Sequence, residues 1–98
     1  KLPVYRGTVF RSLRSDDMEN YGQFMEMHKE GNIVTYPAFT STGTEVYDDT
    51  MDIQLIIQSK TGRDMREYNP EEHEIVFGRN ACFICEKKEG KTIWMREV

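Results

Sequence analysis

The sequence has little cysteine, no long apolar run and no excess of positive charge. Apolar stretches such as Leu55–Ile57 and Ile75–Phe77 are far shorter than the roughly 20 residues that cross a bilayer. The 13 Lys and Arg residues are outnumbered by 17 Asp and Glu, which gives a formal net charge of −4. Because nucleic-acid phosphates are bound by an excess of Lys and Arg, we expect partners that are small molecules or proteins, with neither membrane nor nucleic acid.

Cysteine is limited to Cys82 and Cys85, and the two histidines, His28 and His73, are remote from each other in the sequence. A structural zinc site needs four suitably spaced ligands, so we expect no metal. Residues three apart on a strand face opposite sides of the sheet. We therefore expect two reduced thiols that share neither an ion nor a disulfide.

With 98 residues, 38% hydrophobic and 31% charged, the chain has the size and composition of one small globular domain. We expect a single domain over residues 1–98. Its strand-like start directly after Lys1 suggests a piece excised from a longer polypeptide.

Runs of β-branched and aromatic residues separated by turn residues predict an α+β domain dominated by sheet. Strands are expected at residues 4–10, 33–36, 38–43, 51–57, 72–77, 81–87 and 92–98. One helix is predicted at about residues 16–30, because Met18, Tyr21, Met25 and His28 recur at helical spacing before Gly31. Residues 59–71 have almost no aliphatic content, so we expect a long and functional loop there.

Three polar clusters lie at strand positions where polar side chains are costly. They are Arg6, the pair Ser41 and Thr42, and the pair Glu72 and Glu74. Simple alternation places Arg6 on the core-facing side of its strand, and places the two glutamates on one face about 7 Å apart. Each cluster alone has an ordinary explanation, namely an ion pair, a strand end or a solvated edge.

In their order along the chain, however, Tyr5-Arg6-Gly7, Phe39-Thr40-Ser41-Thr42-Gly43 and Glu72–Phe77 resemble the Arg–Ser–Glu class of ADP-ribosyltransferases. That class includes clostridial binary toxins, Rho-modifying exoenzymes and phage-borne relatives. Gly62–Tyr68 is similar to the toxin-turn-turn loop of the family, and Thr92–Val98 to its closing strand. The resemblance implies a β-rich mixed sandwich of two small sheets at an NAD cleft, with one main flanking helix.

The resemblance also implies an activity, the transfer of ADP-ribose from NAD to a protein side chain with release of nicotinamide. Breaking this bond builds positive charge on the ribose, and a carboxylate beside that charge binds the transition state better than the ground state. Glu74 matches the catalytic glutamate of the family, and Glu72 matches the residue that prepares the acceptor. A carboxylate at Glu72 can bind a guanidinium bidentately, which implies arginine as the acceptor.

Other residues of the motifs match the NAD-binding positions of the family. Arg6 matches the arginine that holds the NAD phosphates, and Gly7 beside it would let the nicotinamide amide approach the backbone. Ser41 matches the serine that orients the catalytic glutamate, and Thr42 supports its strand. Tyr47 is the candidate for the aromatic ring that stacks on nicotinamide.

The sequence departs from the family at Gly43, where a second serine or threonine is common. We expect weaker support of the pocket with the chemistry kept. Tyr68, in the loop before Glu72, is expected to touch the acceptor protein. His73 alternates with the two glutamates and is therefore expected to point away from the pocket.

Two other functions stay open from the sequence. One is a catalytically silent domain of the same fold that binds protein, for instance in a phage particle. The other is an ADP-ribosyltransferase whose acceptor is a nucleic acid, which the net charge of −4 disfavours. The main interpretation is a toxin or effector module of a larger phage or bacterial polypeptide, secreted or delivered into the cytoplasm of a target cell. An immunity protein that plugs the cleft would be a compatible partner.

Overall fold

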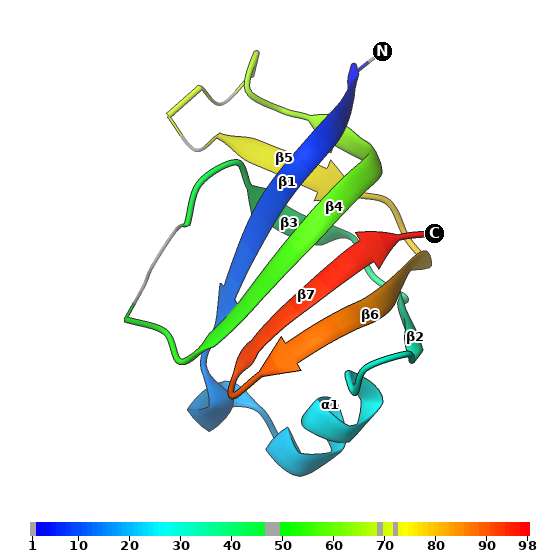
Figure 1. The fold of residues 1–98 in the computed structure, drawn as a ribbon. Coiled ribbons are helices and arrows are strands. Elements are labelled where there is room, and N and C mark those ends of the chain that lie inside the picture. The colour runs from blue at the N-terminus through cyan, green and yellow to red at the C-terminus, as the bar shows by residue number, and fades with distance from the viewer. Residues whose placement is uncertain (1, 47–49, 69, 72) are drawn as a thin grey trace.

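The computed structural model describes residues 2–46, 50–68, 70–71 and 73–98. Within these residues the chain forms seven strands, one α-helix and one 3-10 turn (Figure 1). The strands are β1 (Val4–Leu13), β2 (Ile33–Tyr36), β3 (Thr40–Gly43), β4 (Ile53–Asp64), β5 (Glu74–Phe77), β6 (Ala81–Glu89) and β7 (Thr92–Glu97). The 3-10 turn spans Ser15–Asp17 and the helix α1 spans Tyr21–Met27. No helix in this part of the chain is long and apolar enough to span a bilayer.

The strands form one continuous hydrogen-bonded sheet in the order β1-β3-β5-β4-β7-β6-β2. Because β1 also pairs along its length with β4, the four strands β1, β3, β5 and β4 close on themselves as a ring. The expected mostly-β architecture with one helix is thus observed, but the two separate sheets of a sandwich are not. The physical reason is β4, whose 12 residues belong both to the ring and to the open sheet, so the hydrogen bonding is never interrupted.

The core fills the ring and the space between the sheet and α1. On β4, Ile53, Leu55 and Ile57 are buried at alternate positions, as expected for a strand with one face in the core. The rings of Phe77 and Phe83 meet edge to face with centroids 5.0 Å apart. The remaining buried hydrophobic residues are Val9, Val34, Ile75, Cys85, Ile93 and Met95.

The helix is shorter than the residues 16–30 predicted. Asn20 caps its start, because its side chain accepts a hydrogen bond from the Gln23 backbone N–H at 2.9 Å. Ser15 caps no helix and instead donates its backbone N–H and its hydroxyl to Asp52, at 3.0 and 2.5 Å. Hydrogen bonds from Ser15, and then from Lys91, lower the pKa of the Asp52 carboxyl. The polar residues before Asn20 therefore fasten the chain to the segment that precedes β4.

Candidate active site

Ser41 and Glu74 are in direct contact on neighbouring strands. β3 and β5 run antiparallel with Gly43 opposite Glu74 and Ser41 opposite Val76. In this register Ser41 and Glu74 lie diagonally on one face, and the Ser41 hydroxyl donates to Glu74 Oε2 at 2.5 Å. Glu74 is half-buried and Ser41 is exposed. The hydrogen bond therefore fixes a carboxylate that solvent and ligands can reach.

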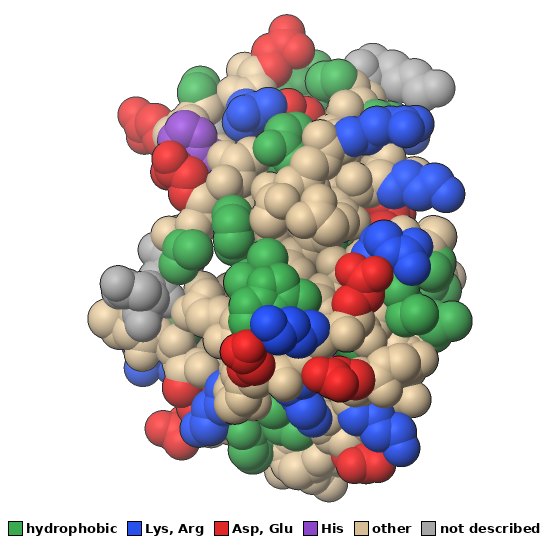
Figure 2. Space-filling model, in the orientation of Figure 1, with side chains coloured by type: hydrophobic (Ala, Val, Ile, Leu, Met, Phe, Trp, Pro, Cys, Tyr) green, Lys and Arg blue, Asp and Glu red, His purple; other side chains and the backbone are tan. Residues whose placement is uncertain are grey.

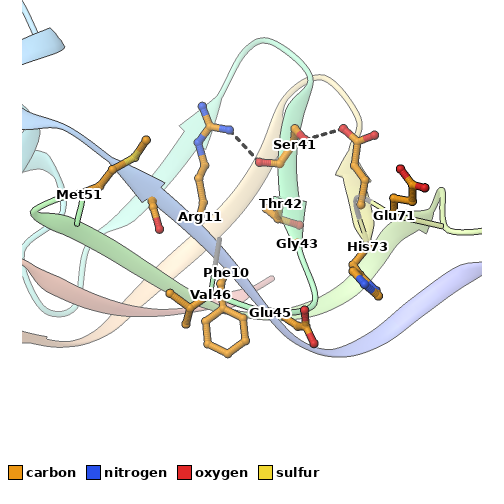
Figure 3. A pocket seen from close by; sticks show the side chains of 12 residues that line it. Phe10, Arg11, Ser41, Thr42, Gly43, Glu45, Val46, Met51, Glu71 and His73 are labelled. Atoms are coloured by element: carbon orange, nitrogen blue, oxygen red, sulfur yellow. Dashed lines mark hydrogen bonds between the residues drawn. The ribbon is translucent and has the colours of Figure 1, made fainter. Parts of the chain in front are cut away.

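An arginine on β1 hydrogen-bonds the backbone of Ser41, next to this contact. Arg11 Nη1 donates to the backbone oxygen of Ser41 at 2.7 Å (Figure 3). β1 reaches β3 where Phe10 lies opposite Gly43, which brings Arg11 beside the strand that contains Ser41. A guanidinium, a hydroxyl and a carboxylate from three strands thus lie within reach of one bound molecule.

Arg6, which the sequence analysis placed here, does not line this site. It is five positions before Arg11 on β1, and at about 3.3 Å per residue the two Cα atoms are roughly 16 Å apart. The register of β1 against β4 also shifts between Tyr5 and Gly7, so simple alternation fails. Val9 is fully buried and Arg6 is exposed, which contradicts the prediction that Arg6 faces the core. Gly7 likewise lies outside the site.

The sequence contains a residue pattern that marks Arg11 as well as Arg6. Phe10-Arg11-Ser12 repeats the aromatic–arginine–small pattern of Tyr5-Arg6-Gly7 five positions later. Both segments lie on the same strand, and only the pairing of β1 with β3 at Phe10 decides which arginine approaches Ser41.

The three side chains open onto a cavity of about 550 Å³, within the range of small-molecule sites. Its lining residues are Phe10, Arg11 and Ser12 of β1, Ser41, Thr42 and Gly43 of β3, Glu45, Val46 and Met51 of the connection to β4, and Glu71, His73 and Glu74. The one cation among these lining residues is Arg11, and the acids are Glu45, Glu71 and Glu74. The cavity is thus cationic only where Arg11 lies.

A second cavity of about 250 Å³ shares Arg11 with the first as a lining residue. Its other lining residues are Leu13, Phe24, Tyr36, Thr40 and Leu55. Two of these residues are aromatic and two are aliphatic. The cavity therefore suits a flat and weakly polar group. Arg11 is the polar boundary between the two spaces.

A hydrogen-bonded pair of titratable side chains, buried His28 and half-buried Tyr36, lies beside this second cavity. His28 Nδ1 lies 2.7 Å from the Phe24 carbonyl oxygen, and His28 Nε2 lies 2.6 Å from the Tyr36 hydroxyl. Because a carbonyl only accepts, Nδ1 is the protonated nitrogen and Tyr36 donates to Nε2 of a neutral ring. Burial lowers the pKa of His28 and raises the pKa of Tyr36, so both groups are neutral near pH 7.

Thr42 and Gly43, two further residues of the predicted motifs, both line the large cavity. Thr42 is buried, and its hydroxyl donates to the Ile75 carbonyl at 2.6 Å, which ties β3 to β5. Gly43 lines the cavity, where an added Cβ would meet the Glu45 carbonyl oxygen at 3.4 Å. The remaining site predictions, Glu72 and Tyr47, lie outside the described residues.

His73 lines the cavity, so the prediction that it points away from the pocket is wrong. That prediction assumed a strand through Glu72, but β5 begins only at Glu74. His73 precedes the strand and has a left-handed backbone with φ of 49°. Its carbonyl accepts a hydrogen bond from the Thr44 N–H at 3.0 Å. Strand alternation therefore does not apply to it.

No protein-family model matches the chain. Among curated proteins, a Mycobacterium avium (strain 104) protein named "Putative NAD(+)--arginine ADP-ribosyltransferase Mav" is 35% identical to it over 100 residues. The match takes in 90% of this chain and 11% of Mav. The chain thus spans about a tenth of the length of the curated relative it matches.

Solved structures show the same fold. The ADP-ribosyltransferase HopU1 of Pseudomonas syringae pv. tomato superposes with a TM-score of 0.78 at 25% identity, over 98% of this chain and 47% of HopU1. The Vis toxin, an ADP-ribosyltransferase from Vibrio splendidus, gives 0.74 at 21% identity, over 100% of this chain and 51% of Vis. The chain has the ADP-ribosyltransferase fold, and the resemblance expected from its motifs is confirmed.

Proposed function

We propose that this chain is an NAD-dependent mono-ADP-ribosyltransferase domain that modifies arginine side chains of a target protein. The contact between Ser41 and Glu74, in one cavity with Arg11, is the observation that supports this most directly. The name of Mav and the activity of HopU1 point the same way. On the same resemblance we propose that the domain acts as a toxin or effector.

The residues around the two cavities suit NAD as the substrate. The planar guanidinium of Arg11 lies between the cavities and can bind pyrophosphate oxygens through parallel N–H bonds. The aromatic and aliphatic walls of the second cavity suit a heterocyclic ring. We therefore propose that Arg11, rather than Arg6, holds the NAD phosphates, because Arg11 lines both cavities.

The transfer exchanges one bond for another at C1′ of the ribose. The bond from C1′ to the nicotinamide nitrogen breaks, and its electron pair leaves with nicotinamide. A guanidino nitrogen of the acceptor forms the new bond to C1′ and loses one proton. We propose that Glu74 stabilises the positive charge that develops on the ribose, that Ser41 orients Glu74, and that Glu72 receives the proton.

We further propose that the exposed side chain of Tyr68 contacts the target protein. Tyr68 is 64% exposed and lies in the turn that follows β4. That turn is fixed next to the site, because the Tyr68 N–H donates to the Met65 carbonyl and the Met65 N–H donates to the Glu74 carbonyl, both at 2.9 Å. An exposed aromatic ring at this place is a suitable anchor for a protein surface.

The direct test is transfer of labelled ADP-ribose from NAD to agmatine, a small guanidine acceptor, with nicotinamide release as a second readout. Wild-type protein should catalyse both, and Glu74→Gln should lose at least about a hundredfold in rate because the charge beside the ribose is removed. Glu89→Gln, at an exposed glutamate of β6, is the matched control and should keep full activity. Absence of turnover by the wild type would favour the protein-binding function instead.

A further inference from the structure

The large cavity has two chemically different ends. In Figure 3, Arg11 and Ser41 lie together at one end, and Phe10, Glu45 and His73 lie at the other. The first end combines a cation with hydrogen-bonding groups. The second combines an aromatic ring, an imidazole and a carboxylate. Glu74 contacts the first end through its hydrogen bond with Ser41.

The position of His73 is set by its backbone. Its left-handed conformation, with φ of 49°, is uncommon for a residue other than glycine, and such residues are concentrated at functional sites. Two hydrogen bonds fix the backbone from His73 onward, because the His73 carbonyl accepts from the Thr44 N–H and the Glu74 carbonyl accepts from the Met65 N–H. His73 and Glu74 consequently line one cavity, although adjacent residues of a regular strand face opposite sides.

The charged side chains at each end of the cavity indicate which part of the substrates binds there. The phosphates of NAD are negative, so they belong at the Arg11 end and are repelled from Glu45 and Glu71. With the ribose beside Glu74, the side that remains for an incoming guanidinium is the end that contains His73 and Glu45. That end offers a negative charge and two flat rings, which match the charge and the planar shape of a guanidinium.

We propose that His73 determines the acceptor specificity of this site, by stacking its imidazole ring on the planar guanidinium of the acceptor arginine while Glu45 supplies charge. The proposal rests on the proposed function, and it names the residue that receives the acceptor rather than one that binds NAD. Guanidinium groups are weakly hydrated and stack readily on aromatic faces. Stacking would hold the reacting nitrogen toward C1′ without a covalent role for His73.

Two substitutions separate the ring from the backbone conformation. His73→Asn removes the ring, but asparagine tolerates the left-handed region well. His73→Phe keeps a flat aromatic ring. We expect His73→Asn to raise KM for agmatine about three- to fivefold, the size of an exposed cation–π contact, and to raise KM for NAD by a smaller factor in the same reaction. His73→Phe should bring KM back to near the wild-type value.

A second measurement does not depend on turnover. The chain has only two histidines, and His28 is buried, so the imidazole NMR signals can be assigned by comparison with His73→Asn. Titration of wild-type protein with agmatine should shift the His73 ring signals and leave those of His28 in place. Lysine-like amines of the same length, such as cadaverine, should produce a smaller shift because an ammonium does not stack as a plane.

The outcomes distinguish this inference from the proposed function. If wild-type protein modifies agmatine but His73→Asn leaves its KM unchanged, or if agmatine shifts neither histidine, the role of His73 is overturned and the proposed function stands. Equal loss of NAD hydrolysis and transfer in His73→Asn would also overturn it, in favour of a structural role. A wild-type protein without transferase activity would overturn both.

Discussion

The hydrogen bond from Ser41 to Glu74 is the interaction on which the proposed chemistry most depends at the scale of single residues. A hydrogen bond to a charged group contributes about 1.5–3 kcal/mol, which corresponds to roughly tenfold to hundredfold in rate if it is needed in the transition state. We predict that Ser41→Ala lowers the rate of nicotinamide release by that factor. Ser41→Thr, which keeps a hydroxyl, should restore most of it, and equal rates for Ser41→Ala and wild type would contradict the role.

The two arginines of β1 provide a paired test of the phosphate site. Arg11→Lys should raise KM for NAD about tenfold, because an ammonium cannot replace the two parallel hydrogen bonds of a guanidinium. Arg6→Lys is the matched control and should leave KM within twofold of wild type, since Arg6 is exposed outside the cavity. The reverse ranking in steady-state kinetics would return the role to Arg6.

The contact of Ser41 with Glu74 agrees with the sequence expectation, whereas the exposure of Arg6 and the direction of His73 do not. Ser41 and Glu74 were identified because their motifs are distinctive in type and order. The choice between Arg6 and Arg11 depends on a register shift in β1, and the direction of His73 depends on a left-handed backbone. Both features depend on contacts with residues far away in the sequence. Alternation along a single segment therefore does not predict them.

At the scale of elements, the junction between α1 and β2 depends on a histidine that must stay neutral. Burial lowers the pKa of His28, so below about pH 6.5 the unfolded chain binds a proton that the folded chain does not. Stability attributable to His28 is therefore full above that pH and is lost as the pH falls. We predict that the urea midpoint drops between pH 7.5 and pH 5.5.

The control for this prediction is the second histidine. His73→Asn should keep the wild-type pH dependence, because His73 is exposed, whereas His28→Asn should flatten it at a lower overall stability. A wild-type midpoint that stays constant over the same range would show that His28 does not set this dependence.

Some strand boundaries differ from the predicted ones, because tertiary contacts outweigh the preferences of the local sequence there. Residues 59–64 were expected to begin a long loop, yet β4 continues to Asp64. The reason is pairing at both sides, with Tyr5 opposite Gly62 on β1 and Val76 opposite Arg63 on β5. The strands that lie entirely in the open sheet were predicted more closely, for instance β7 at Thr92–Glu97, because their alternation is regular.

At the scale of the whole molecule, the ring of four strands both stabilises the fold and positions the site. β1, β3 and β5 contribute Arg11, Ser41 and Glu74 respectively, and β4 closes the ring behind them. Displacement of any one of these strands would separate the three side chains. Stability of the ring and activity of the site should therefore change together.

Gly62 tests this coupling, because it lies on β4 opposite Tyr5 of β1 and close to Ile75 of β5. A Cβ at this position would lie 2.7 Å from Ile75 Cγ2 and 2.7 Å from Ser59 Oγ. We predict that Gly62→Ala lowers the free energy of unfolding by about 1–3 kcal/mol and reduces transfer activity. Gly78→Ala is the matched control, with nothing within 4 Å of its added Cβ, and should unfold like wild type in urea.

The most direct measurement of the central claim is a crystal structure of the Glu74→Gln variant with NAD bound. We predict that the dinucleotide phosphates contact the guanidinium of Arg11 and that C1′ of the nicotinamide ribose lies beside residue 74 and Ser41. A dinucleotide bound at Arg6, or on a surface apart from Ser41 and residue 74, would contradict the account.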